Sequence, residues 1–354
     1  MFIGQRLKLA RQAVGLSLRD LAEKVQLSAQ ALSKYERGLD VPSSGVLLRL
    51  ARALGVKTEY FFRPDLQLEI TPVFRKRSTL GKRQEAAIVS RIREWLERYL
   101  ELEGLFPPEQ AACFALPDGL DNHVTTMEGV ERLAEQLRGA WGLGLDPIEN
   151  FMEMLEDRGI KVGLVDGCPD FDACTFWAGE CPILVVRSDM PGDRQRFNLA
   201  HELGHLVLVL DGILNAEVAA HRFAGAFLVP ASAARRELGE HRRRITVSEL
   251  HLLKHKYGLS MQGWIYRAKD LQIISESTAV CLFREFRTQG WHVKEPGSQV
   301  PPEEPKRMAQ LVLRAYAEGL VSESRAAELL GVPLGEFLVA SHGGRAGAPE
   351  GLRD

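Results

Sequence analysis

Two histidines four residues apart constrain this chain more than any other feature of its sequence. His201 and His205 lie in the run Arg-Gln-Arg-Phe-Asn-Leu-Ala-His-Glu-Leu-Gly-His, residues 194–205. If this run is helical, both imidazoles lie on one face and can reach one metal ion, and Glu202 lies beside them, toward a metal-bound water. Apolar residues flank the motif on most sides, so we expect a buried helix, in which histidine and glutamate without a metal or partner would be costly. The spacing therefore predicts a zinc hydrolase site.

A third protein ligand must come from elsewhere, because a catalytic zinc is held by three protein ligands and keeps one position for water. The next apolar run, residues 217–230, carries Glu217 in its first turn and ends at a proline. Two neutral histidines and one carboxylate leave enough charge on zinc to lower the pKa of a bound water toward neutrality. The alternative is a chance His-Glu-x-x-His match on a solvated helix, and the predicted burial favours zinc.

These motifs carry a family resemblance. Arg-x-x-Phe-x-Leu-Ala-His-Glu-Leu-Gly-His, then Glu-x-x-Ala-His-x-Phe-Ala and Leu-x-Pro, resembles the ImmA/IrrE family of metallopeptidases. The resemblance implies a zincin-like core in which His201, His205 and Glu217 bind Zn²⁺ and Glu202 is the general base. His221 departs from the family pattern, which usually has asparagine there. We expect His221 to orient a ligand from outside the coordination sphere. Direct metal binding and assistance to the oxyanion are the alternatives.

Residues 1–63 read as a separate all-α unit. Apolar residues recur at helical spacing, Ser17 and Ser28 are expected to cap the second and third helices, and Gly55 is expected to end the fourth. The segment has 11 lysines and arginines against 5 acidic residues, a net charge of +6, whereas the whole chain carries -2. Short helices with a tight turn and a basic excess predict a helix-turn-helix unit that meets a phosphate backbone.

Leu-Ser-x-x-x-Leu-Ala at residues 16–22, Leu-Ser-x-x-x-Leu-Ser-x-Tyr-Glu-x-Gly at 27–38 and Pro42 resemble XRE/Cro-type repressor domains. The resemblance implies a recognition helix over residues 28–37 and double-stranded operator DNA as partner. The candidate DNA contacts are Arg19, Ser28, Gln30, Ser33, Lys34 and Arg37. Leu18 departs from a frequent glutamine, and Gln26 replaces the usual glycine of the turn. A degenerate domain kept for protein contacts is the alternative.

The rest of the chain divides into three predicted parts. Residues 64–115 read as a linker and a helix whose apolar stripe suggests a homodimer. Residues 116–275 form an α+β peptidase domain with strands near 160–165 and 183–186, and 276–354 form a helical module, either a second helix-turn-helix or a docking module. The expected fold is mostly α with this α+β domain. The last dozen residues are expected to be disordered.

Other cysteine and histidine spacings in the chain give weaker evidence for a metal site. Cys168, Cys174 and Cys181 have spacings of six and seven, which fit no zinc signature and suggest small buried apolar residues. His251 and His255 repeat the four-residue spacing without a glutamate between them. The basic cluster at residues 235–244 reads as a solvated helix end. The five cysteines form no Cys-x-x-Cys pair, and no apolar run reaches about eighteen residues, so we expect a cytoplasmic, bacterial-type protein that does not meet a membrane.

Two hypotheses from different classes follow. In the first, the chain is a DNA-tethered zinc endopeptidase that cuts a helix-turn-helix repressor, in trans or in itself, in response to stress, DNA damage or phage signals. In the second, it is a transcription factor whose peptidase-like domain is a non-catalytic sensor. The intact set of His201, Glu202, His205 and Glu217 favours the first, because a sensor has no need for a general base.

Overall fold

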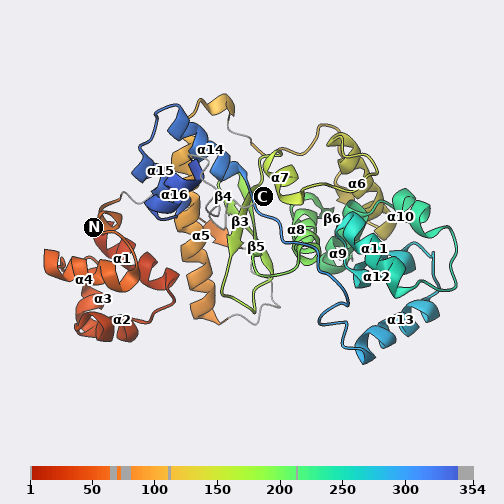
Figure 1. Ribbon diagram of the computed structural model, residues 1–354, viewed down its shortest axis with the longest axis horizontal. Helices are drawn as coiled ribbons and strands as arrows, with labels where there is room; N and C mark the ends of the chain where they lie inside the picture. The colour runs from red at the N-terminus through yellow and green to blue at the C-terminus, as the bar shows by residue number, and fades with distance from the viewer. Residues whose placement is uncertain (1, 64–69, 73–80, 111–112, 213, 342–354) are drawn as a thin grey trace.

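The computed structural model describes residues 2–63, 70–72, 81–110, 113–212 and 214–341 (Figure 1). It is mostly helical with a small sheet, as the sequence predicts. Helices α1 to α4 form a unit at one end, α6 to α13 lie at the other end, and the long helix α5 lies between them beside the sheet (Figure 1). No helix among the described residues is both long and apolar enough to cross a membrane.

The N-terminal unit has the predicted helices. They are α1 (Phe2–Ala13), α2 (Leu18–Val25), α3 (Ala29–Glu36) and α4 (Ser44–Leu54), followed by a 3₁₀ turn, η1 (Thr58–Phe62). The Ser17 and Ser28 side chains accept hydrogen bonds from Asp20 N and Ala31 N, and Gly55 ends α4 in the left-handed conformation. Gln26 also adopts positive φ, 54°, in the turn after α2. The backbone there requires the conformation that glycine adopts most easily, although the chain supplies glutamine.

The main sheet has the order β1-β4-β5-β3. Strands β3 (Lys161–Val165) and β5 (Cys181–Arg187) are the two that the sequence predicts, and they pair in parallel. Strand β4 (Ala173–Ala178) pairs antiparallel with β5, and β1 (Ile70–Pro72) pairs antiparallel with β4. The segment predicted as a linker therefore contributes an edge strand. A second, two-stranded sheet joins β2 (His123–Val124) to β6 (Val209–Leu210).

Helix α5 (Lys82–Glu103) covers one face of the main sheet. Its residues Ile88, Ile92 and Leu96 pack with Phe176 and Val185 of the strands. Cys168 and Cys174 are buried in the same cluster, as small apolar residues would be, and no disulfide joins the five cysteines. The α5 stripe that suggested a homodimer is thus buried within this chain, so it provides no surface for a second copy.

The helix-turn-helix unit lies against α5. Arg6 of α1 forms a buried ion pair with Glu97, and Arg91 of α5 donates a hydrogen bond to Ala13 O across 2.9 Å. Arg83 at the start of α5 also pairs with Asp20 of α2 at 2.7 Å. These contacts involve α1 and α2, and α5 contacts the sheet with its other side. One helix therefore connects the two units.

The opposite face of the sheet packs on the largest core. Its helices are α6 (Met127–Ala140), α7 (Phe151–Glu156), α8 (Gly192–Val207), α9 (Ala216–Leu228), α10 (Ala231–Leu238), α11 (Val247–Tyr257), α12 (Met261–Asp270) and α13 (Glu276–Thr288). Ala279, Leu282 and Phe286 of α13 belong to this core. The domain boundary predicted after residue 275 therefore falls inside one packed unit.

The chain then returns across the molecule through residues 289–306 to the last three helices, which Figure 1 draws in blue. Carboxylates fix this strap at helix starts: Glu295 accepts from Met261 N and Gln262 N, and Glu303 accepts from Phe151 N and Met152 N, at 2.9–3.0 Å. Helices α14 (Arg307–Ala317), α15 (Glu323–Leu330) and α16 (Leu334–Ser341) then pack on α5. The terminal segment predicted to be disordered lies outside the described residues.

Candidate functional site

Helices α8 and α9 build the candidate site by approaching each other closely. A Cβ at Gly204, between the two histidines of the motif, would lie 3.1 Å from Phe223 Cδ1 and 3.3 Å from Ala220 Cα. Glycine therefore permits α9 to lie directly on α8 at this level. Asn215 caps α9 by accepting hydrogen bonds from Glu217 N and Val218 N, which fixes Glu217 in the first turn.

This packing gathers three potential ligand side chains. Nε2 of His201 lies 3.6 Å from one carboxylate oxygen of Glu217, and Nε2 of His205 lies 3.7 Å from the other. Two ligand atoms about 2.1 Å from a tetrahedral zinc are separated by roughly 3.4 Å, so the observed spacing fits a zinc ion. Among the described residues, these three form the one group of three or more donors close enough to hold a metal. His201 is buried, and Glu217 is the most exposed of the three.

Glu202 points to the sheet side of the same helix. Its carboxylate accepts a 2.7 Å hydrogen bond from the Thr175 hydroxyl of β4, and both residues are 5% exposed. Thr175 was not singled out by the sequence, because the residue belongs to a strand that the hydrophobic pattern did not indicate. The structure thus adds one polar side chain to the site.

His221 lies beside the histidine pair without belonging to the group of three. Its ring is tilted against His201, with ring centroids 4.4 Å apart, and is stacked on Phe197 at 5.6 Å and an interplanar angle of 19°. The side chain therefore contacts one candidate ligand through its ring.

The candidate DNA-contacting residues lie on and next to α3. Ser28 caps this helix, and Gln30, Lys34, Arg37 and Arg19 of α2 are exposed, whereas Ser33 is half-buried. Because the unit contacts α5 through α1 and α2, these side chains remain at the surface. A partly buried ion pair between Arg11 of α1 and Glu36 of α3, 2.6 Å long, joins α3 to α1.

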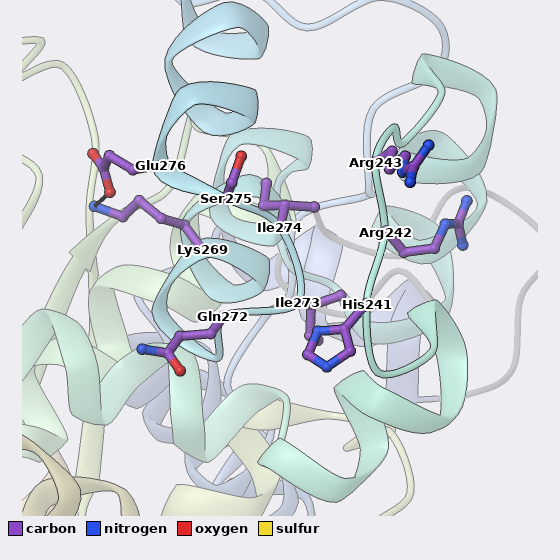
Figure 2. Close-up of a pocket in the computed structure, with 9 residues that line it drawn as sticks. All are labelled: His241, Arg242, Arg243, Lys269, Gln272, Ile273, Ile274, Ser275 and Glu276. Carbon is purple, nitrogen blue, oxygen red and sulfur yellow. Dashed lines mark ion pairs between the residues drawn. The ribbon is translucent and has the colours of Figure 1, made fainter.

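The other candidate clusters lack the chemistry of a site. His251 and His255 have ring centroids 4.6 Å apart, and the Ser298 hydroxyl is 3.1 Å from His255 Nε2, but the described residues provide no third metal donor. A cavity of about 580 Å³ lies between the loop that follows α10 and the junction of α12 with α13 (Figure 2). Its charges are partly neutralised, since Lys269 pairs with Glu276 at 4.0 Å and Arg242 with Glu249 at 2.9 Å. It is lined by His241, Arg242, Arg243, Lys269, Gln272, Ile273, Ile274, Ser275 and Glu276.

Two family models match the chain. One, described as helix-turn-helix, covers residues 7–61, and the other, described as an IrrE N-terminal-like domain, covers residues 170–269. The second range runs from just before β4 into α12 and includes the three candidate ligands His201, His205 and Glu217. The chain therefore combines an XRE-type helix-turn-helix domain with an IrrE/ImmA-like peptidase-family domain, which confirms both resemblances.

Curated relatives are similar over short stretches. The HTH-type transcriptional regulator ImmR of Bacillus subtilis is 38% identical over 65 residues, 18% of this chain and 51% of the relative. An uncharacterized HTH-type transcriptional regulator of Rickettsia prowazekii is 43% identical over 61 residues, 17% of this chain and 47% of the relative. Human endothelial differentiation-related factor 1 is 36% identical over 55 residues, 16% of this chain and 37% of the relative. The chain spans at most about half the length of these relatives.

Proposed function

We propose that this chain is a DNA-binding transcriptional regulator with a zinc-dependent endopeptidase site. The observation that carries the proposal is the approach of His201, His205 and Glu217 to within metal-binding distance, with Glu202 fixed beside them. Three neutral or anionic donors and an adjacent carboxylate are the set that peptide-bond hydrolysis on zinc requires.

His201, His205 and Glu217 would hold the ion. Zinc bound there supplies a Lewis acid for the peptide carbonyl and lowers the pKa of a bound water. Glu202 removes the proton from the attacking water and transfers it to the leaving amine, a contribution of about 10²- to 10⁴-fold. The hydrogen bond from Thr175 holds the Glu202 carboxylate in the orientation for both transfers. His221, through its ring contact, orients His201.

The DNA-binding half of the proposal rests on α3. Gln30, Ser33 and Lys34 contact base edges or phosphates of operator DNA, and Arg19, Ser28 and Arg37 contact phosphates near the helix start and end. The name of the ImmR relative, a transcriptional regulator, supports this role. The substrate is a helix-turn-helix repressor or the chain itself, and cleavage releases DNA under stress, DNA damage or phage induction.

Intact-mass spectrometry of the purified full chain with zinc tests the proposal. The wild-type protein is incubated alone and with helix-turn-helix repressors encoded beside it, with and without damaged or single-stranded DNA as trigger. We expect one discrete cut, in the chain or in a repressor, which Glu202→Gln abolishes while zinc content is preserved. If wild type and Glu202→Gln leave every protein intact under all conditions, the peptidase assignment fails, and the non-catalytic sensor takes its place.

A further inference from the structure

Strand β1 lies along the outer edge of β4. Ile70 is paired with Ala178, Thr71 with Trp177 and Pro72 with Phe176, in antiparallel register. The inner edge of β4 is paired with β5 over its whole length, Ala173 to Ala178. The outer edge is therefore the edge of β4 at which another strand can add, and β1 covers its C-terminal half.

This edge leads to the candidate general base. Pro72 is paired with Phe176, and the next residue of β4 toward its start is Thr175, whose hydroxyl donates to Glu202. An extended peptide that pairs antiparallel with β4 would follow the direction of β1 and pass the side chain that holds Glu202. Strand addition to a sheet edge is a general mode of peptide recognition, in which main-chain hydrogen bonds provide the affinity.

We propose that β1 occupies in cis the outer edge of β4, the edge along which an extended peptide would approach the peptidase site. An extended segment of a substrate protein then reaches Glu202 by displacing β1. The inference rests on the proposed function, because it assigns the access route to that site.

The pairing of β1 is limited enough to be displaced. Proline has no N–H, so Pro72 and Phe176 cannot exchange both ladder hydrogen bonds. In the alternating antiparallel pattern, the doubly bonded pair is therefore Thr71 with Trp177. A three-residue strand with one such pair separates from the sheet at lower cost than β5, which is paired over six positions.

The described residues that flank the segment carrying β1 are anchored to neighbouring helices. Arg63, before it, forms an ion pair with Glu328 of α15, and Arg83, after it, pairs with Asp20 at 2.7 Å. Because β1 belongs to the same chain as β4, it competes for this edge at an effective concentration of about millimolar. A peptide added in trans must compete with this intramolecular strand, so weakening β1 is expected to increase its affinity.

The test measures peptide binding to the full chain in the Glu202→Gln background. The probe is a fluorescent peptide with the sequence of residues 66–76, followed by anisotropy. Thr71→Pro removes the ladder N–H of β1, and its matched control, Thr71→Ala, keeps it. We expect the Thr71→Pro protein to bind the probe at least about 10-fold more tightly than the Thr71→Ala protein. A probe with proline at the position of Thr71 should bind neither.

Equal affinity of the two proteins for the probe, or no binding to either, would overturn the proposal. If Thr71→Pro does not fold, Ile70→Cys with Ala178→Cys in a Cys181→Ser chain replaces it. This pair locks β1 in place when oxidised, so the probe should bind only after reduction, and equal binding in both states would overturn the proposal. The readout needs no catalysis. Absence of peptidase activity would therefore reject the proposed function. The binding of the probe would still show whether β1 competes for the edge of β4.

Discussion

The hydroxyl of Thr175 donates a 2.7 Å hydrogen bond to the carboxylate of Glu202, and this bond joins the middle of β4 to α8. Both groups are buried, so the bond is protected from water. It ties β4 to the helix that carries the histidine motif. The orientation of the candidate base is thus set by a strand, although the base itself lies on a helix.

Loss of the hydrogen bond between Thr175 and Glu202 should reduce the catalytic rate more than it weakens the binding of substrate or zinc. Thr175→Val preserves the shape of the side chain and removes the donor to an ionised group, an interaction of about 1.5–3 kcal/mol. We expect kcat to fall roughly 10- to 100-fold with little change in KM or zinc content. Thr175→Ser should restore most of the activity. A Thr175→Val enzyme with unchanged kcat would show that Thr175 has no positioning role.

Zinc retention should depend on the three gathered ligands. The purified chain is expected to hold about one zinc, and His201→Ala or Glu217→Ala should weaken retention against a chelator by more than the 10- to 100-fold typical of outer partners. His255→Ala is the matched control, because this histidine has the same four-residue spacing without a third donor. Elemental analysis after chelator dialysis measures the effect. Equal zinc content in all four proteins would exclude the cluster as the metal site.

The contact between α8 and α9 should be sensitive to a single methyl group. Gly204→Ala places Cβ against Phe223 and Ala220, so we expect a loss of about 1–3 kcal/mol in the free energy of unfolding and weaker zinc retention. Gly139→Ala in α6 meets no atom within 4 Å and should be neutral or stabilising by up to about 1 kcal/mol. Denaturant titration compares them. Similar effects of the two substitutions would contradict the close approach.

Local signals in the sequence were sufficient to predict the helix-turn-helix unit and the two helices that carry the candidate metal ligands. Ser17 and Ser28 cap helices through atoms within three residues, and the spacing of His201 and His205 defines one helix face. Such features depend on neighbours in the chain. They could therefore be predicted from residue order alone.

Features that depend on distant partners could not be predicted. Strand β1 has three residues in a segment of linker composition, and it is a strand because β4 pairs with it. The apolar stripe of α5 was visible, but its partners, the sheet and α14 to α16, are separated from it in sequence. The position of the strap could not be predicted either, because Glu295 and Glu303 cap helices that begin far from them in the chain.

DNA binding should respond differently to two neighbouring residues of α3. In the full chain, Lys34→Ala should weaken binding to all sequences and reduce the dependence of log affinity on log salt by about 1, since one phosphate contact is lost. Gln30→Ala should reduce the discrimination between bases at one position of the operator, with a loss of about 1–3 kcal/mol in binding free energy for the preferred base. Lys57→Ala, outside α3, serves as control. Titrations against selected operators at several salt concentrations decide this. An unchanged salt slope for Lys34→Ala would remove Lys34 from the interface.

The last prediction concerns Glu156, at the end of α7. Its carboxylate accepts hydrogen bonds from Lys306 N and Arg307 N, at 2.9 and 3.0 Å, where the strap enters α14. Burial raises the pKa of Glu156 to about 7, although these hydrogen bonds oppose the shift. Its ordinary pKa is 4.5. Between these values the unfolded chain releases the proton and the folded chain keeps it, so stability falls as pH rises.

Protonated Glu156 contributes fully to the free energy of unfolding below pH 4.5. This contribution is lost progressively as pH rises from 4.5 to about 7, and no further change is expected above that pH. Glu156→Gln cannot ionise, so the difference in unfolding free energy between the variant and the wild type should grow in favour of the variant by at most about 3 kcal/mol from pH 4.5 to 7.5. Glu318→Gln, which removes a surface ion pair with Arg314, should follow the wild type within about 0.5 kcal/mol. Urea titrations at each pH measure these curves. Parallel curves for wild type and Glu156→Gln would show that Glu156 titrates alike in the folded and unfolded chain.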